Sequence, residues 1–477
     1  MGDRAHAPWP AHPTRNPVVV AREEWDDEAL LFHPDTGETV GVNQVGLVVW
    51  RLLDGSRGLA AIMAGLRQVL ADVPPSARED VVAFVAGLAE RGLARFGGTA
   101  PPVAAPPVAL GSRRATLMRT PRQVSIDITA RCNLRCRYCY FFDNPAVEYR
   151  DLPTAEWLRF FDELGRCGVM RVCLAGGEPF MRPDLPELVA GLVRNGLRFA
   201  ILSNGALVTD ALAAQLAATG RCDYVQISVD GSSAEIHDSA RGTGAFAGAI
   251  RGLRTLQRHG IEVTARTTVL PRNLADLDAV ARLLLDELGV GVMSTNAAGH
   301  LGSCQQHRRE LQLAVAQRGI AMAALERLAA RYPGRITGTA GPLAEARAWR
   351  AMEAARCGGA PPFAGGGRLS ACGCPRQEIA VRSDGVIVPC PLLAHLELGR
   401  VTTDSLASVW RDGELLNRLR ARGSITLDRF PACAGCPYVP YCTGNCPGTA
   451  FTLTGGIDVP SPDACLRRFL AQGGRLP

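Results

Sequence analysis

The residues of this chain that point most directly to chemistry are three cysteines, Cys132, Cys136 and Cys139, spaced C-x3-C-x2-C. They follow an apolar run at residues 124–129 that is typical of a buried strand. Grouped thiolates bind iron–sulfur clusters, and a cubane [4Fe–4S] cluster normally takes four of them. Three thiolates on one loop therefore predict a cluster with one iron left open to bind another molecule.

A second set of cysteines lies in the last quarter of the chain. Its members are Cys372, Cys374, Cys390, Cys433, Cys436, Cys442, Cys446 and Cys465. The absence of an export signal and the clustered spacings indicate metal ligands in a reducing compartment rather than disulfides. Zinc, which also binds C-x2-C pairs as thiolates, is the alternative to iron–sulfur clusters for both sets.

The elements that must position the first cysteine loop form a regular series. Short apolar strands are expected at residues 124–129, 171–175, 198–202, 224–229, 262–269 and 291–296, with amphipathic helices between them. Strands with little polar alternation indicate a parallel sheet that is buried on both faces. We therefore predict an α/β fold whose core is a partial (β/α)6 TIM-like barrel. Ligands of such folds bind at the C-terminal strand ends, where the cysteine loop lies.

The remaining sequence divides into parts with distinct composition. Residues 16–97 are expected to form a small α+β winged-helix-like domain: a hairpin at 29–42, with Gly37 in its turn, followed by three helices. Proline and alanine at 98–117 indicate a linker. We expect the barrel to span 118–304, a helical bridge to span 305–365, and a cysteine-rich domain to span 366–477.

Composition excludes several classes of protein. The 477 residues are 47% hydrophobic and carry a net charge of +6, but the basic residues are scattered and no nucleic-acid reader motif occurs. No stretch of the chain has the length and apolar character of a membrane span. The sequence thus predicts a cytoplasmic protein that binds neither nucleic acid nor membrane.

With Tyr138 directly before its last cysteine, the C-x3-C-x2-C loop resembles that of the radical S-adenosylmethionine (SAM) superfamily. The resemblance implies that the open iron binds the amino and carboxylate groups of SAM, whose cleavage gives a 5′-deoxyadenosyl radical. The cofactor then carries the difficult chemistry, and the protein orients it and excludes water.

Further residues would contact SAM if the resemblance holds. A G-G-E-P turn at the second strand end matches the family motif that receives the SAM amino group, with Glu178 pairing with the ammonium. The implied SAM-binding residues are Tyr138, Gly176, Gly177, Glu178, Pro179, Ser203, Asn204, Ser228, Asp230 and Arg241. Ordinary turn chemistry is the alternative for the residues that follow the G-G-E-P turn.

The C-terminal cysteines resemble those of the SPASM extension of peptide-modifying radical SAM enzymes, which holds two auxiliary iron–sulfur clusters. By position, Cys433, Cys436, Cys442 and Cys465 would hold one cluster. The other would take Cys390 and Cys446 with one or both of Cys372 and Cys374, a tight C-x-C pair that leaves the type of this cluster open.

The N-terminal domain resembles the PqqD-like peptide-recognition domain, through residues 41–50, 52–55 and 88–93. In relatives, the leader of a precursor peptide adds as a strand to the exposed sheet edge. The implied partner of this chain is therefore a precursor peptide, whose leader is expected at the edge near residues 40–42. The alternative is a small packing domain without a ligand.

Together these resemblances predict a radical SAM oxidoreductase that matures a ribosomally synthesised peptide, with a flavodoxin or ferredoxin as reducing partner. Auxiliary clusters favour oxidative crosslinking, which forms a thioether, ether or carbon–carbon bond. Epimerisation would need a hydrogen-atom donor, and Cys304 is the thiol that we consider for that role. The alternatives are a radical SAM dehydrogenase or mutase of a small molecule and a non-catalytic iron–sulfur scaffold that binds a peptide.

Overall fold

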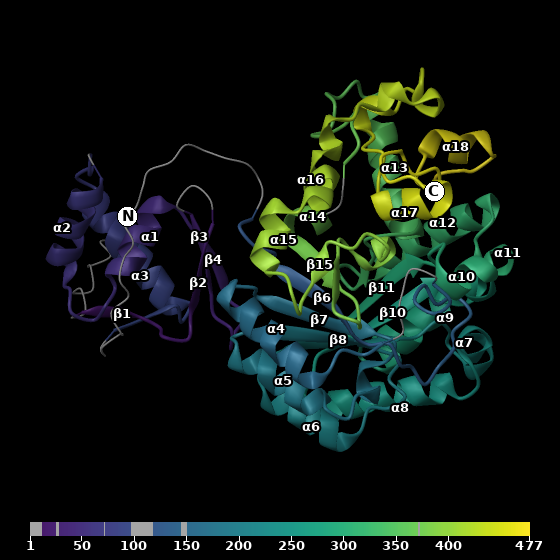
Figure 1. Ribbon diagram of the computed structural model, residues 1–477. Helices are drawn as coiled ribbons and strands as arrows, with labels where there is room; N and C mark the ends of the chain where they lie inside the picture. Colours follow the sequence, from purple (N-terminus) through teal and green to yellow (C-terminus); the bar gives the residue numbers. More distant parts are fainter. Residues whose placement is uncertain (1–11, 25–27, 71, 97–117, 145–149, 371–372) are drawn as a thin grey trace.

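The computed structural model describes residues 12–24, 28–70, 72–96, 118–144, 150–370 and 373–477. A small N-terminal unit lies beside the barrel, and the C-terminal part covers the barrel on another side (Figure 1). Within the described residues, no helix has both the length and the apolar character needed to cross a membrane. The linker predicted at 98–117 and the cysteine at position 372 fall outside these residues.

Six parallel strands form the barrel that the apolar runs predict. They are β6 (Gln123–Thr129), β7 (Arg171–Gly176), β8 (Arg198–Ser203), β9 (Cys222–Ser228), β10 (Val263–Val269) and β11 (Val292–Ala297). Each strand pairs in parallel with its neighbour in chain order, and β12 (Ile336–Thr337) adds in parallel beyond β11. The partial (β/α)6 barrel is therefore confirmed, and no predicted strand is displaced by more than two residues.

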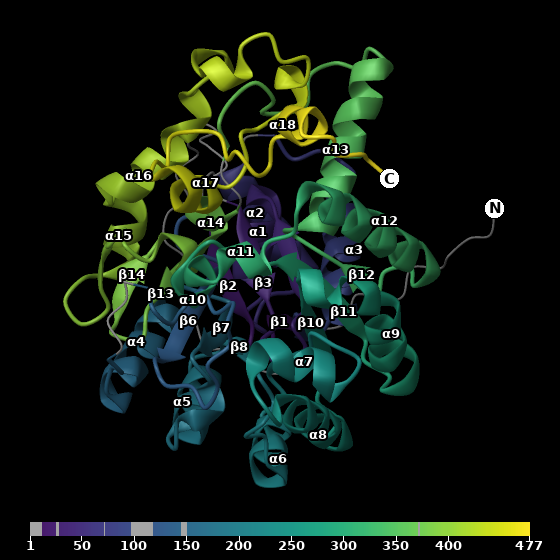
Figure 2. The ribbon, with the colours of Figure 1, turned by 90° about the vertical axis from the view of Figure 1, so that its right-hand side faces the viewer.

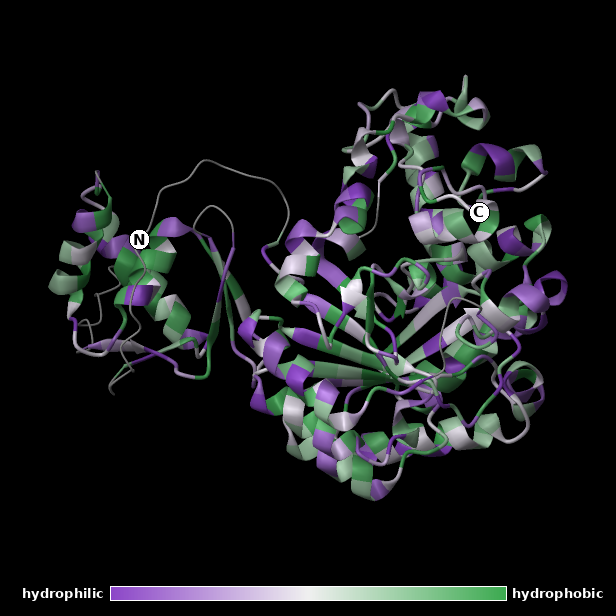
Figure 3. Ribbon diagram, in the orientation of Figure 1, coloured by the Kyte–Doolittle hydropathy of each residue, from purple (hydrophilic) through white to green (hydrophobic). Residues whose placement is uncertain are grey.

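Helices cover the outer face of the barrel strands (Figure 2). They are α4 (Thr154–Arg166), α5 (Leu185–Arg194), α6 (Asp210–Ala218), α7 (Ala234–Arg241), α8 (Ala245–Arg258) and α9 (Leu277–Ala281). Hydrophobic and hydrophilic residues are mixed along these helices (Figure 3), and the buried hydrophobic ones share one core with the strands, in which Trp157 of α4 and Phe199 of β8 are fully buried. Burial of the outward-facing strand residues leaves the alternate residues facing the barrel interior.

Strands from the C-terminal part extend the barrel sheet beyond β6. Here β13 (Glu378–Val381) pairs in parallel with β6, and β14 (Val386–Val388) and β15 (Gly399–Arg400) continue the sheet in antiparallel pairing. The accompanying helices are α10 (Gly302–Gln306), α11 (Arg308–Leu311), α12 (Val315–Arg331), α13 (Pro342–Cys357), α14 (Cys374–Gln377), α15 (Leu406–Asp412), α16 (Glu414–Ala421), α17 (Pro447–Thr454) and α18 (Leu466–Ala471). The cysteine-rich part and the barrel therefore share one sheet.

The N-terminal unit contains the predicted hairpin and three helices. The hairpin strands β3 (Ala29–Phe32) and β4 (Thr39–Val42) join β2 (Val20–Glu23) in an antiparallel sheet of order β2-β3-β4. Helices α1 (Gln44–Leu52), α2 (Leu59–Val69) and α3 (Ala77–Glu90) pack with it around a core of their own, and β1 (Pro13–Arg15) pairs with β5 (Ala94–Phe96). Gly37 has the positive φ of 78° that the turn was expected to require.

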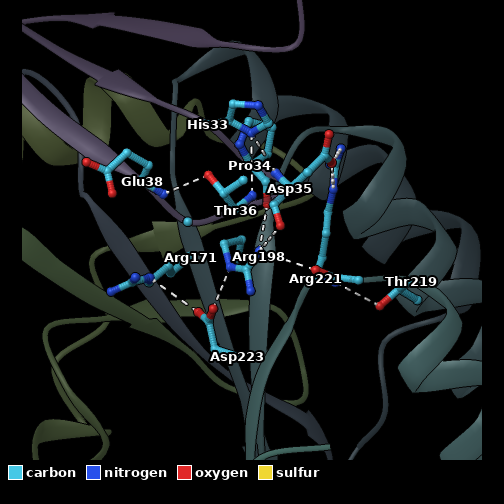
Figure 4. Close-up of polar contacts among 12 residues, drawn as sticks. His33, Pro34, Asp35, Thr36, Glu38, Arg171, Arg198, Thr219, Arg221 and Asp223 are labelled. Carbon is cyan, nitrogen blue, oxygen red and sulfur yellow. Dashed lines mark hydrogen bonds and ion pairs between the residues drawn. The ribbon is translucent and has the colours of Figure 1, made fainter. Parts of the chain in front are cut away.

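Two groups of contacts hold this unit against the end of the barrel where the strands begin. Arg198, the first residue of β8, donates hydrogen bonds to the carbonyl oxygens of Pro34 (2.8 Å) and Asp35 (2.9 Å) in the hairpin turn (Figure 4). Arg221 binds the carboxylate of Asp35 at 2.6 Å. On β2, the guanidinium of Arg22 donates to the main chain just before β6 and before β7. The N-terminal unit thus lies opposite the C-terminal strand ends.

Candidate iron–sulfur and SAM site

The cysteine loop is anchored at the C-terminal end of β6. The carboxylate of Asp151 accepts hydrogen bonds from the hydroxyl of Thr129 (2.8 Å) and the main-chain nitrogen of Ala130 (2.6 Å). Farther along, the main-chain nitrogen of Arg137 donates to the carbonyl of Ala240 at the end of α7. These contacts hold both sides of the loop against barrel elements.

The three cysteines of this loop line a single cavity of about 280 Å³. The predicted SAM-binding residues on the same walls are Tyr138, Gly176, Gly177, Ser203, Asn204, Ser228 and Arg241. They come from the ends of β7, β8 and β9 and from α7, so the structure brings together segments more than 100 residues apart in the chain. The remaining three, Glu178, Pro179 and Asp230, are not on the cavity wall.

Asp230 organises one side of the cavity rather than lining it. Its carboxylate, in a residue that is 1% exposed, accepts hydrogen bonds from the Tyr138 hydroxyl, from Nε of Arg241 (2.5 Å) and from the main-chain nitrogen of Thr268 (2.8 Å). The guanidinium of Arg241 also lies 5.3 Å from the ring centroid of Tyr138. The buried ion pair thus fixes the aromatic residue between the cysteines and leaves other guanidinium nitrogens of Arg241 to face the cavity.

Glu178 joins the ends of two neighbouring strands. Its buried carboxylate accepts hydrogen bonds from the Ser203 hydroxyl (2.8 Å) and from the main-chain nitrogens of Asn204 (2.8 Å) and Phe180 (3.2 Å). Burial raises the pKa of Glu178 to about 7, against the effect of these hydrogen bonds. The carboxylate therefore fixes the turn after β8, and its pairing with the SAM ammonium stays a prediction.

The two glycines of the G-G-E-P turn are required by a close approach of the main chain. A Cβ atom on Gly177 would lie 2.1 Å from the carbonyl oxygen of Arg131, and one on Gly176 would lie 2.4 Å from that of Thr129. The main-chain nitrogen of Gly177 donates to this Thr129 oxygen at 2.8 Å. The glycines thus let the end of β7 pack directly against the start of the cysteine loop.

The thiols of the loop fit the donor set of an iron–sulfur cluster. Burial raises the pKa of all three, that of Cys136 to about 11, so the thiolates need a strong positive charge beside them. No three His, Cys, Asp or Glu side chains in the described ranges gather closely enough to hold a single metal ion. A cubane cluster does not need such a group, because each of its irons takes its own thiolate.

Four C-terminal cysteines lie close together. Burial raises the pKa of Cys433 to about 11, and the thiols of Cys442, Cys465 and Cys436 add to this shift in that order. Cys465 caps α18, and Cys436 and Cys442 pack with the aromatic cluster between α13 and α18. The four residues that the sequence assigns to one auxiliary cluster are thus neighbours in space.

Three of the remaining cysteines lie at the starts of short helices. Cys390 precedes a short 3-10 helix (Pro391–Leu393) and Cys446 precedes α17, and these two helices are in contact. Cys374 begins α14, which packs against α16 and β13, whereas position 372 lies outside the described residues. The assignment of this second set to one cluster stays a prediction.

Several cavity residues are absent from the sequence prediction. Tyr140, Gln226, Arg266, Thr268 and Asn296 line the same cavity as the cysteines. Four of them are residues of β9, β10 and β11 that point into the barrel. The sequence could have indicated these four residues, because each is a polar or charged residue at an alternate position of a largely apolar strand. Arg266 is the clearest case.

Cys304, considered above as a hydrogen-atom donor, lies in α10. Its side chain is fully buried, and its main-chain nitrogen donates to the carbonyl of Cys139 at 3.2 Å. A substrate cannot reach this thiol in the structure. Cys304 packs behind the cysteine loop and does not serve as a donor in this conformation.

The barrel and its cysteine-lined cavity define an enzyme class that binds an iron–sulfur cluster and a small cofactor at the strand ends. Comparison with known families agrees: residues 126–284 match the model of the radical SAM superfamily. Residues 28–94 match coenzyme PQQ synthesis protein D, and residues 372–437 match an iron-sulfur cluster-binding domain, SPASM.

Individual proteins resemble this chain over most of its length. The mycofactocin maturase MftC of Mycobacterium ulcerans is 30% identical over 359 residues, which cover 74% of this chain and 90% of the relative. The PqqA peptide cyclase of Ruegeria pomeroyi is 29% identical over 337 residues, 69% of this chain and 83% of the relative. Among solved structures, Streptococcus suis SuiB bound to precursor peptide SuiA has a TM-score of 0.64 at 14% identity, covering 95% of this chain and 100% of SuiB.

This chain belongs to the radical SAM superfamily and carries a PqqD-like domain before its barrel and a SPASM domain after it. The cofactors of the barrel are SAM and a [4Fe–4S] cluster, and the SPASM domain implies auxiliary iron–sulfur clusters. When bound, SAM and the cluster supply hydrogen-atom abstraction by a 5′-deoxyadenosyl radical.

Proposed function

We propose that this protein is a maturase that modifies a ribosomally synthesised precursor peptide by oxidative crosslinking, forming a thioether, ether or carbon–carbon bond. The observation that carries the proposal is the combination, in one chain, of a cysteine-lined barrel cavity with a PqqD-like domain and a SPASM domain. Two proteins that resemble this chain in sequence support it: one is named a maturase of mycofactocin, and the other is named a cyclase of the PqqA peptide.

The N-terminal sheet offers an edge for the leader of such a peptide. In the described part of the chain, β4 pairs with β3 alone. Because the nitrogen of His33 donates to the carbonyl of Glu38, antiparallel alternation points the main-chain groups of Thr39 and Gly41 away from β3. A leader strand can pair with these groups, and side-chain pockets beside them would select its sequence. The opposite edge, β2, carries Arg22 and faces the barrel.

In this proposal, the cysteine loop holds the SAM cluster through Cys132, Cys136 and Cys139. Arg241 is held by Asp230, and we propose that its remaining donors bind the SAM carboxylate. Ser203, Asn204 and Ser228 would contact the rest of SAM from the strand ends, as would Tyr138 and the main chain of Gly176 and Gly177. Glu178 and Asp230 act as positioning residues, because their carboxylates hold the turns that carry these contacts.

Oxidative crosslinking is favoured because a substrate radical must lose an electron to become a closed-shell product. We propose that Cys433, Cys436, Cys442 and Cys465 hold one electron-accepting cluster, and that Cys390 and Cys446 hold a second with one or both of the cysteines at 372 and 374. A flavodoxin or ferredoxin would reduce the SAM cluster. Such clusters persist in a reducing compartment, which favours a cytoplasmic enzyme.

The test uses the anaerobically reconstituted full-length enzyme with reductant, SAM and a short peptide encoded beside its gene, in deuterated water. Intact-mass analysis of the peptide is the readout. A loss of two hydrogens per event is expected for crosslinking. A gain of one deuterium would indicate epimerisation instead.

Two outcomes would contradict the proposal more deeply. An unaltered peptide with abundant 5′-deoxyadenosine would show that the enzyme acts on another substrate. The absence of 5′-deoxyadenosine under reducing conditions would remove the radical chemistry itself. A Cys136→Ala variant is the matched control, since it keeps the N-terminal domain but removes one ligand of the SAM cluster.

A further inference from the structure

The charged side chain of Arg266 lines the barrel interior but is not among the residues proposed to bind SAM. Arg266 lies in the middle of β10, between Ala265 and Thr267, both of which are fully buried. The side chain of Arg266 points to the opposite side and lines the same cavity as the three cysteines. A cationic group thus forms part of the wall of the reaction chamber.

The guanidinium of Arg266 is nearly without protein partners. Its Nε donates to Oε1 of Gln226 at 3.2 Å. The other groups close enough to affect its pKa are the Tyr224 hydroxyl and the Cys173 thiol, and both are neutral at physiological pH because burial raises their own pKa values. No carboxylate forms an ion pair with Arg266 among the residues that the structure describes.

Arg266 is partly buried, and five of the buried arginines of this fold have the carboxylate that it lacks. Each of the following pairs joins a buried arginine to a carboxylate: Arg22–Glu24, Arg182–Asp184, Arg198–Asp223, Arg241–Asp230 and Arg382–Asp384. Removing a guanidinium from water without an anion is unfavourable, and burial lowers the pKa of Arg266 accordingly. A cavity that keeps such a group is therefore suited to an anion supplied from outside.

The position of the guanidinium distinguishes this anion from SAM. In the sheet, the backbone of Arg266 lies opposite Ser228. Its side chain, however, contacts Gln226, which lies two residues nearer the start of β9. The side chain therefore slopes away from the C-terminal strand ends, where Arg241 and the cysteine loop lie. An anion bound by Arg266 would sit deeper in the barrel than SAM.

We propose that Arg266 binds a carboxylate of the precursor peptide and thereby fixes the core segment beneath SAM. This inference rests on the proposed function and adds a specificity determinant to it. The planar fork of a guanidinium matches a carboxylate through two parallel hydrogen bonds, which also fixes the direction of approach. The carboxylate belongs either to an Asp or Glu side chain of the core or to the C-terminus of the peptide.

The test compares peptide variants on the reconstituted holoenzyme. The peptide encoded beside the gene is made with each acidic side chain neutralised singly, as Asp→Asn or Glu→Gln, and separately with a C-terminal amide. Binding of the fluorescent core segment without its leader, and the ratio of 5′-deoxyadenosine to modified peptide, are measured. One neutralised peptide is expected to bind about 10- to 100-fold more weakly and to raise the ratio. Its identity distinguishes the two sources of the carboxylate.

Two enzyme variants localise the effect. Arg266→Gln should weaken binding of the core segment that keeps all its carboxylates by about the same 10- to 100-fold. Neutralising the critical carboxylate of the peptide should then cause no further loss of binding to this variant. Gln226→Glu places a carboxylate within reach of Arg266, so it should raise the melting temperature yet weaken core binding similarly. This second variant keeps the proposal testable if Arg266→Gln fails to fold. Arg258→Gln, a change at an exposed arginine on α8, is the control and should bind the core as the wild type does.

The outcomes separate the two proposals. If the wild type binds and modifies the peptide equally well whichever carboxylate is neutralised, this inference is wrong and the proposed function stands. Gln226→Glu with unchanged core binding would also overturn it. If the wild type cleaves SAM but neither binds nor modifies the peptide, the proposed function fails and takes this inference with it.

Discussion

Arg198 offers the sharpest test of how the N-terminal domain is attached to the barrel. Its side chain crosses the boundary between the two, and the residue is 8% exposed. One nitrogen donates to the carbonyl oxygens of Pro34 and Asp35, and Nε pairs with Asp223 (Figure 4). Arg198→Ala removes all of these contacts at once and leaves the two carbonyl oxygens at the boundary without their donor.

The size of the effect follows from these contacts. A hydrogen bond that involves a charged group contributes about 1.5–3 kcal/mol, so two such bonds set an upper range of about 3–6 kcal/mol. Both carbonyls share one nitrogen, Asp223 keeps Arg171 at 3.3 Å, and water can enter the opened boundary. We therefore expect docking to weaken by about 2–4 kcal/mol, while the Arg22 contacts remain.

Hydrogen exchange and X-ray scattering measure this change. In Arg198→Ala, the amides of turn residues 35–37 should exchange at least about tenfold faster. The radius of gyration should increase as the N-terminal unit separates from the barrel. Arg194→Ala is the matched control: its side chain is 58% exposed, it pairs with Asp162 at 3.4 Å, and its loss should cost at most about 0.5 kcal/mol. Unchanged exchange and scattering in Arg198→Ala would refute the docking described here.

Three further changes test the site. Cys136→Ala should lose the iron of one cluster, about four atoms per chain, and with it all cleavage of SAM. Iron content and 5′-deoxyadenosine measure the two losses, and full SAM cleavage would contradict the ligand assignment. Asp230→Asn leaves Arg241 buried without its carboxylate and should lower the free energy of unfolding by about 3–5 kcal/mol. Denaturant unfolding measures this change, and a decrease of less than about 1 kcal/mol would contradict the role of this ion pair. Asp127 is buried and its pKa is raised from 3.8 to about 7, so the stability that it confers falls as pH rises between these values. Asp127→Asn should remove that fall, which is at most about 2.7 kcal/mol between about pH 5 and about pH 8. The same pH dependence of the unfolding free energy in both proteins would contradict the shift.

The parts of the fold that follow from local sequence were predictable. Parallel strands buried on both faces must be short apolar runs, and residues 171–175 and 198–202 fall inside β7 and β8. The hairpin turn with Gly37 was predictable for a similar reason, because few residues tolerate its positive φ. Such features depend on neighbours in the chain, which a single sequence displays.

Pairings between distant segments were not predictable in this way. Strand β13 joins the edge of β6, and Glu378 there pairs with Gln123. The sequence of residues 378–381 does not indicate with which strand they pair. The contact of Arg198 with the N-terminal unit was not predictable for a different reason. All 52 Lys and Arg positions of the chain are arginines, so residue type alone does not indicate which one lies at a domain boundary.

The motif residues show that the position of a side chain can be predicted while its hydrogen-bond partners within the protein cannot. The G-G-E-P turn lies beside the cysteine loop as expected, and its carboxylate accepts hydrogen bonds from another strand end. Glu178 holds Ser203 and Asn204, so the second and third strand ends are joined by one buried group. Hydrogen-bond partners from another strand decided this, and the spacing of the motif carries no information about them.

Strand β8 relates the two functional ends of the molecule. Its first residue, Arg198, holds the turn next to β4, and its last, Ser203, binds Glu178 at the cofactor site. Six residues of strand span about 20 Å. A peptide whose leader lies on β4 must therefore cross at least that distance to reach the cavity, or about six extended residues. If the leader pairs with β4 as proposed, the docking contacts fix that edge relative to the barrel, and the length of peptide between leader and core should set which residue reaches the cavity.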